Sequence, residues 1–134
     1  AYDFVSRHIA NVKQNNTYKY LYTHQGEHSL PDRLNGPHGV DHADELYLQF
    51  YPFVKNVVKL NENDESMSKI LMSLWKSFIK HGNPSTDDIL WQPIISSTER
   101  EYLHLNGTAQ MEQSSELQDR MEFWDTLMNG VYDD

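Results

Sequence analysis

One helix dominates the apolar pattern of this chain. Seven apolar side chains between residues 67 and 79 recur at the three- and four-residue steps that put them on one helical face. They are Met67, Ile70, Leu71, Leu74, Trp75, Phe78 and Ile79. Asn63 or Asp64 is suited to cap the start of the helix, and Gly82 followed by Pro84 is expected to end it. Other elements must cover an apolar face as broad as this one. The helix is therefore expected to pack on a sheet or on further helices.

The remaining elements are expected to be short. The tyrosines of segment 17–23 alternate with other residues, which is typical of a strand. Glycine and proline punctuate the long stretch that follows, which therefore reads as a loop. In chain order, the sequence predicts a helix over 4–12, a strand over 17–23, a loop over 24–38, a short helix over 46–50 that Pro52 ends, strands over 91–95 and 101–105, and a helix from near Ser115 to Gly130.

The apolar faces outnumber the partners that the chain can offer them. The last helix is expected to turn an apolar face inward, made of Leu117, Met121, Trp124, Leu127 and Met128. Only segment 17–23 reads as a strand of any length, and isolated strands and hairpins are marginal in water. We therefore expect these 134 residues to need additional protein to complete their core.

Composition excludes several classes of function. With 11 Lys and Arg against 20 Asp and Glu, the formal charge is −9, which disfavours binding to nucleic acid. The apolar runs are too short for a membrane span, and no disulfide or thiolate metal site can form without cysteine. Asn15 and Asn106 begin glycosylation sequons, which tilt the expectation towards a secreted protein while leaving the compartment open.

The segment with the clearest chemical content is 39–46, Gly-Val-Asp-His-Ala-Asp-Glu-Leu. It holds His42 in a glycine-led loop directly before a short helix. Histidine ordinarily titrates near neutral pH, so an imidazole in such a place suits a general base. A second interpretation is a loop histidine that is satisfied by hydrogen bonds. The carboxylates of Asp41, Asp44 and Glu45 are typical caps or solvated partners of a helix start.

Metal binding is a third interpretation of the same histidine. His38 lies four residues before His42, and His24 and His28 form another pair with this spacing. Two histidines four apart bind zinc well only when a helix places both on one face. Glycine and proline beside these pairs disfavour a helix, so the metal interpretation is the weaker one.

Several motifs, in order along the chain, together resemble the type-B carboxylesterase and cholinesterase family, and insect carboxylesterases in particular. They are Gly39-x-x-His42-Ala43-x-Glu45-Leu46, Leu74-Trp75-x-x-Phe78-Ile79-Lys80-x-Gly82-Asn83-Pro84, Trp91-x-Pro93, Glu101-Tyr102-Leu103-x-Leu105 and Arg120-Met121-x-Phe123-Trp124-Asp125. The resemblance implies an α/β fold. Residues 1–134 would form the C-terminal segment of an α/β-hydrolase domain, without an internal boundary.

The resemblance also implies a function. His42 would be the general base of a Ser-His-Glu/Asp triad in a carboxylic ester hydrolase, with Glu45 as possible support for its imidazole. No Gly-x-Ser-x-Gly elbow occurs in these residues, so the nucleophile and the acid would lie upstream and the segment alone would be inactive. The expected partners are a small-molecule ester and the remainder of the hydrolase domain, and no cofactor or metal is implied. The alternative is a catalytically inactive cholinesterase-like adhesion or scaffold domain.

Overall fold

The computed structural model describes residues 8, 17–27, 39–50, 59–96, 101–113 and 115–129, with only the backbone at 115–118, 128 and 129. Its elements are β1 (Tyr20–Tyr22), α2 (Asp44–Phe50), α3 (Glu62–His81), β2 (Glu101–Leu105), β3 (Ala109–Gln113) and α4 (Ser115–Asn129). The helix expected over 4–12 lies outside these residues apart from His8. None of the helices in the described ranges is long and apolar enough to cross a membrane.

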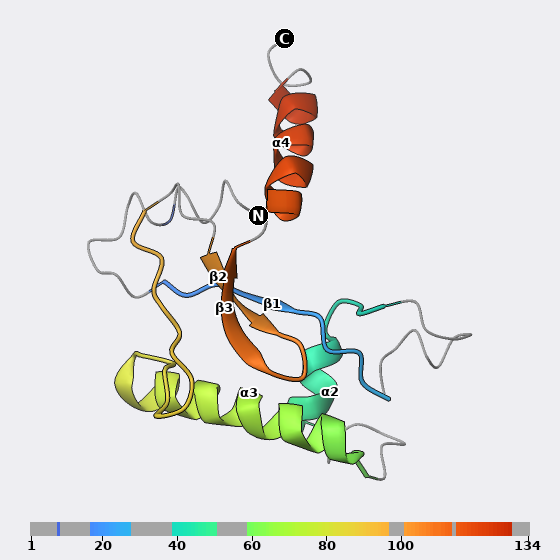
Figure 1. Cartoon of the computed structure of the whole chain (residues 1–134), viewed down its shortest axis with the longest axis vertical. Helices are drawn as coiled ribbons and strands as arrows, with labels where there is room; N and C mark the ends of the chain where they lie inside the picture. The colour runs from blue at the N-terminus through green and yellow to red at the C-terminus, as the bar shows by residue number, and fades with distance from the viewer. Residues whose placement is uncertain are drawn as a thin grey trace.

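The three strands form one mixed sheet in the order β1-β2-β3. β1 runs parallel to β2, with Tyr20 opposite Leu103, and β2 runs antiparallel to β3, with Leu103 opposite Met111. Parallel neighbours need a long crossover, and here the connection from β1 to β2 includes both α2 and α3. Figure 1 shows α3 lying along one face of this sheet, with α2 beside its N-terminal end.

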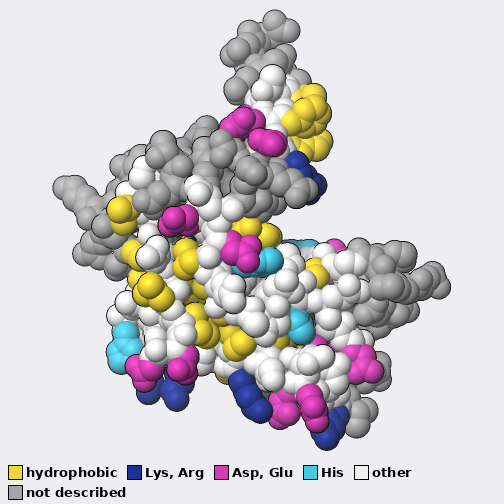
Figure 2. All heavy atoms as spheres, viewed as in Figure 1, with side chains coloured by type: hydrophobic (Ala, Val, Ile, Leu, Met, Phe, Trp, Pro, Cys, Tyr) yellow, Lys and Arg dark blue, Asp and Glu magenta, His cyan; other side chains and the backbone are white. Residues whose placement is uncertain are grey.

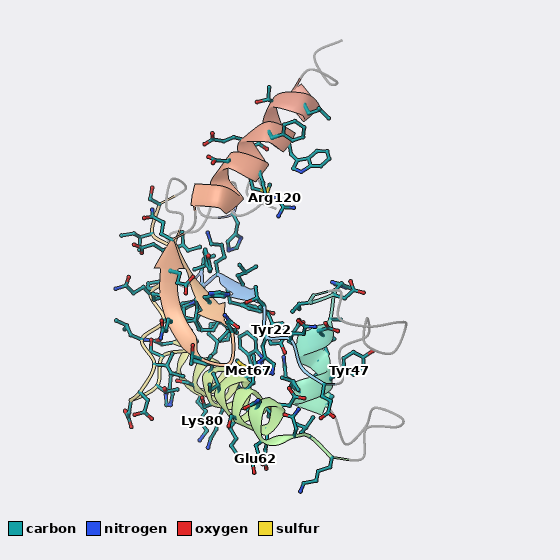
Figure 3. The ribbon with its side chains drawn as sticks, turned by 45° about the vertical axis from the view of Figure 1, so that its right-hand side comes forward. Tyr22, Tyr47, Glu62, Met67, Lys80 and Arg120 are labelled. Atoms are coloured by element: carbon teal, nitrogen blue, oxygen red, sulfur yellow. The ribbon has the colours of Figure 1, made fainter. Side chains whose placement is uncertain are left out.

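α3 confirms the helix that the apolar spacing predicts. Its buried face lies against the sheet, and Met67 points from the helix towards the strands while Lys80 lies on the outer side (Figure 3). Gly82 ends the helix with a left-handed φ of 67°, and its N–H donates to the carbonyl of Phe78. The start differs from the expectation, because Asn61, rather than Asn63 or Asp64, is the N-cap and accepts from the N–H of Asp64.

The core lies between α3 and the sheet. Its buried members are Leu48, Leu60, Met67, Leu71, Leu74, Trp91, Leu103 and Leu105. Aromatic rings extend this core along β1: Tyr20 meets Trp75 and Trp91 edge-on at 5.5 and 6.0 Å between ring centroids. Such edge-to-face pairs add to the stabilisation from apolar burial. The short strand β1 is therefore fixed both by its pairing with β2 and by the side chains of α3.

The prediction of a strand over residues 91–95 is wrong. This segment is irregular in the structure, since its backbone groups bond elsewhere. The N–H of Trp91 donates to the hydroxyl of Ser85, and the N–H of Ile94 donates to the carbonyl of Thr17. Pro93 has no N–H to give to a ladder. Burial of Trp91 and Ile94 explains the apolar pattern without a strand.

β3 was not expected from the sequence, which has no β-branched residue over 109–113. The hairpin is set by its turn, in which Gly107 has a φ of 69° and the N–H of Asn106 donates to the carbonyl of Thr108. Asn-Gly is a strong hairpin signal, so this strand could have been predicted. Asn106 is exposed in this turn, and its glycosylation stays a prediction. Asn15 lies outside the described residues.

α4 begins at Ser115, as expected, but does not turn its apolar side inward. Phe123, Trp124 and Leu127 are 60%, 52% and 47% exposed. Figure 1 shows the helix projecting from the end of β3, and Figure 2 shows hydrophobic side chains gathered along one side of it. Within the described residues, about half of the surface of these three side chains is therefore left uncovered.

Candidate functional site

His42 lies in the turn that leads into α2, and its side chain is exposed. Hydrogen bonds within the segment 41–46 fix this turn. A carboxylate oxygen of Asp44 accepts from the N–H of Asp41 at 2.8 Å, and the carbonyl of Ala43 accepts from the N–H of Leu46 at 3.0 Å. Asp44 is itself buried. The backbone of His42 is therefore held while its imidazole remains open to solvent.

Ala43, directly after His42, has a left-handed φ of 71°. It is the one non-glycine residue in the described ranges with a positive φ. Such a conformation costs a non-glycine residue about 1–3 kcal/mol and is found most often at functional sites. The strained residue is the direct neighbour of His42 in the turn that leads into α2.

Glu45 lies against β1. The Tyr20 hydroxyl donates to its carboxylate at 3.5 Å. Burial raises the pKa of Tyr20, and the Glu45 carboxylate raises it further. Among the described residues no hydrogen bond joins the imidazole of His42 to another side chain. Support of His42 by Glu45 therefore stays a prediction.

Tyr22 is the last residue of β1 and lies near α2 (Figure 3), and three carboxylates influence the pKa of its hydroxyl. Burial is the first cause that raises the pKa of its hydroxyl, followed by the negative charges of Asp64, Asp44 and Glu45. The end of β1 thus carries a phenol whose ionisation is disfavoured by burial and by nearby negative charge.

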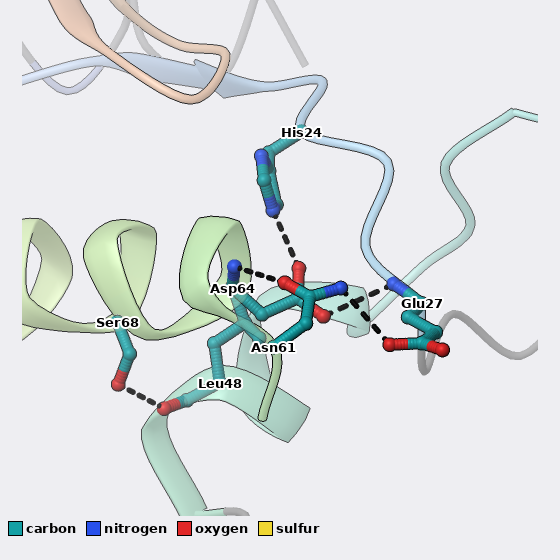
Figure 4. Close-up of polar contacts among 6 residues, drawn as sticks. All are labelled: His24, Glu27, Leu48, Asn61, Asp64 and Ser68. Atoms are coloured by element: carbon teal, nitrogen blue, oxygen red, sulfur yellow. Dashed lines mark hydrogen bonds and ion pairs between the residues drawn. The ribbon is translucent and has the colours of Figure 1, made fainter. Parts of the chain in front are cut away.

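The other histidine near the end of β1 has a clear partner. His24 is buried, and its Nε2 lies 2.8 Å from Oδ1 of Asp64, whose exposed fraction is 1% (Figure 4). No local sequence pattern indicates this pair, since the two residues are 40 positions apart. His28 and His38 lie outside the described residues. Within the ranges that the structure describes, no three His, Asp or Glu side chains gather as they would around a metal ion.

A hydroxyl, an imidazole and a carboxylate also stand in a row across the sheet. Nδ1 of His104 lies 2.9 Å from Glu112, and its Nε2 lies 2.6 Å from the Thr23 hydroxyl. With Nδ1 donating to Glu112, Nε2 accepts from Thr23. A nucleophile of this kind needs free N–H groups for an oxyanion. The N–H groups of Thr23 and His24 both donate to the carbonyl of Leu105, so neither is free to bind an oxyanion, and the row joins the end of β1 to β2 and β3.

The family comparison covers nearly all of the chain. The model of the "Carboxylesterase family" matches residues 1–124. Acylcarnitine hydrolase of Rattus norvegicus is 27% identical over 118 residues, which are 87% of this chain and 21% of that protein. Carboxylesterase 1F of Mus musculus is 32% identical over 109 residues, 81% of this chain and 18% of that protein. Venom carboxylesterase-6 of Apis mellifera is 29% identical over 126 residues, with shares of 88% and 22%.

Solved structures agree on the fold. Juvenile hormone esterase from Manduca sexta superposes with a TM-score of 0.74 at 22% identity, over 96% of this chain and 26% of that chain. A PNB esterase gives a TM-score of 0.57 at 24% identity, over 78% of this chain and 20% of that chain. These neighbours are α/β-hydrolases, so the helices and the mixed sheet described above form a segment of that fold. The chain spans about a fifth of the length of the curated relatives it matches.

Proposed function

Because the chain belongs to the carboxylesterase family, we propose that the complete protein hydrolyses carboxylic esters and that His42 is its general base. The observation that carries the proposal is the exposed His42 side chain on a fixed turn, within the residues that the family model matches. A serine hydroxyl is a weak nucleophile until an imidazole takes its proton, and the imidazole must be able to reach it.

In this proposal the reaction runs in two halves. His42 accepts the proton of the serine hydroxyl as the serine oxygen bonds to the ester carbonyl carbon. The imidazolium then gives that proton to the departing alcohol, which leaves an acyl-serine. In the second half His42 takes a proton from water, the resulting hydroxide attacks the acyl carbon, and the proton returns to the serine oxygen as the acid leaves.

The nucleophile and the acid of this triad are proposed to come from the remainder of the hydrolase domain. The chain corresponds to about a fifth of its relatives, and it contains no Gly-x-Ser-x-Gly elbow. The exposed side of the His42 turn is open to residues outside these 134. The small ester itself is proposed to bind there too. Glu45 is proposed to support the site from behind, through its contact with Tyr20.

The experiment that tests the proposal is an ester assay on the complete protein. We expect turnover of p-nitrophenyl esters that an organophosphate abolishes by modifying one serine, and that EDTA leaves unchanged. A folded protein without turnover and without organophosphate labelling would refute the proposal and favour the adhesion or scaffold alternative. Loss of turnover in EDTA, with His38→Ala as harmful as His42→Ala, would favour the metal interpretation instead.

A further inference from the structure

The first two turns of α3 hold both ends of the chain segment that carries His42. On one side, residues 24–27 follow β1 and contact Asp64. On the other side, α2 follows His42 and contacts Ser68, one helical turn further along α3. Figure 4 shows the two sets of contacts side by side on α3.

The contact at Asp64 uses both oxygens of its carboxylate. Oδ1 accepts from Nε2 of His24 at 2.8 Å, and Oδ2 accepts from the N–H of Glu27 at 3.0 Å. The cap residue of the helix joins the same group, because the Asn61 amide donates to the Glu27 carboxylate at 3.0 Å while its oxygen accepts from the N–H of Asp64. Two charge-assisted hydrogen bonds at a buried carboxylate hold residues 24–27, the first stem, in a defined position on α3.

Gly26 shows how closely this first stem lies on α3. A Cβ atom at that position would meet Oδ1 of Asp64 at 2.7 Å, which is too short for any real contact. The close approach therefore requires glycine at the point where the segment crosses the carboxylate.

The second stem, helix α2, is held by packing and by one hydrogen bond. Leu48 of α2 is 3% exposed and belongs to the core with Met67 and Leu71. Its carbonyl accepts from the Ser68 hydroxyl at 2.6 Å. The start of α2, where His42 lies, is thus fixed relative to the same helix that holds residues 24–27.

We propose that Asp64 is a positioning residue for His42: it ties residues 24–27 to the first two turns of α3, the same turns that hold α2 and with it the turn of His42. This inference rests on the proposed function of His42 as a general base. Asp64 does not contact the ester or the serine. It acts through the first two turns of α3, where Ser68 donates to the carbonyl of Leu48 in α2.

The variant Asp64→Asn tests this with little change of volume. An amide has one acceptor oxygen where the carboxylate has two, so it cannot accept from both His24 and the N–H of Glu27. The matched control is Glu65→Gln, which neutralises the next residue of α3, an exposed carboxylate 3.7 Å from Lys69. Both variants are made in the complete protein, and active sites are counted by organophosphate titration.

We expect kcat per titrated site to fall about 10- to 100-fold in Asp64→Asn, with KM changed less than about threefold, because a displacement near 1 Å costs that much in rate. Glu65→Gln should match the wild type. A purely structural role would lower the number of active sites and leave kcat per site unchanged, and that result would overturn the proposal.

Hydrogen exchange decides the same question without any turnover. In the complete protein, Asp64→Asn should speed the exchange of the amides of 24–27 and 39–44 and leave those of 101–113 unchanged. If Asp64→Asn does not fold, Gly26→Ala displaces the same carboxylate with α3 unaltered, and the same pattern is expected. A wild type without esterase activity refutes the proposed function alone. Unchanged exchange at 39–44 in a folded variant refutes the role of Asp64.

Discussion

Two adjacent acidic residues after His42 have different roles in the structure. Asp44 is buried and closes the turn by accepting from the N–H of Asp41, as expected of a residue at a helix start. Glu45 instead reaches across to Tyr20 on β1. Together they fix the turn at its backbone and at its junction with the sheet, while the imidazole of His42 stays exposed.

Tyr22 leads to a prediction about alkaline pH. Its folded pKa is raised above the ordinary value near 10.0, by burial and then by Asp64, Asp44 and Glu45. The hydroxyl therefore contributes stability below about pH 10 that is lost as the pH rises further, because the unfolded tyrosine ionises first. We expect Tyr22→Phe in the complete protein to lose less stability than the wild type between about pH 9 and 11, measured by urea denaturation. Identical pH dependence in the two proteins would contradict this assignment.

The sequence identified some of these residues and could not identify others. The sequence singles out His42 as a candidate because the motif around it, residues 39–46, is continuous in the chain, and its role as a base stays a prediction. The sequence pairs His24 with His28, four positions away, whereas its partner in the structure is Asp64, on another element. That pairing depends on how β1 packs on α3, so it cannot be predicted from residues that are close in the sequence. Glu45 was placed behind His42, and its contact with Tyr20 also needed the tertiary structure.

Among the elements, α3 was predicted best because its apolar period is long and its end is marked by glycine. Its start was set one turn too late. Asn61, Asn63 and Asp64 are all suitable caps by type. The carboxylate of Asp64 bonds to the stem 24–27, which leaves Asn61 to cap the helix. β3 is a strand that the sequence does not predict. Its residues have no strand preference of their own, and the turn before it and its pairing with β2 define it.

Truncating two neighbouring residues of α3 is expected to change the free energy of unfolding by very different amounts. Leu71 is completely buried in the core, whereas the next residue, Met72, is 50% exposed. We expect Leu71→Ala to lower the free energy of unfolding of the complete protein by about 2–5 kcal/mol, because it leaves a cavity between α3 and the sheet. Met72→Ala is the control and should cost less than about 1 kcal/mol. Equal shifts of the two urea midpoints would show that α3 does not pack as described.

At the scale of the whole molecule, the described part has more apolar surface than it covers. Outer strands of a sheet present unpaired backbone groups, and β1 and β3 are the outer strands of the described sheet. α4 exposes Phe123, Trp124 and Leu127. Both features fit a segment of a larger α/β-hydrolase fold and explain why the inward face expected for the last helix finds no partner here.

We therefore expect the 134-residue segment to be poorly stable when it is expressed alone, and to hydrolyse no ester. The open sheet edges and the apolar side of α4 would meet water or one another. Near-ultraviolet circular dichroism should show a broad thermal transition, and p-nitrophenyl ester turnover should stay at background. A sharp, reversible melt of a monomer would show that the segment is an independent domain. Turnover that an organophosphate inhibits would show that it holds its own nucleophile.

The central claim is that His42 is the base of an esterase, and kinetics of the complete protein test it most directly. His42→Ala removes an exposed imidazole on a turn, so the fold should persist while the serine loses its proton acceptor. We predict that kcat falls by about 10⁴-fold or more, with an unchanged circular dichroism spectrum. His81→Ala, which removes another exposed histidine from the end of α3, should keep wild-type turnover. Near-normal turnover of His42→Ala in an active protein would contradict the account.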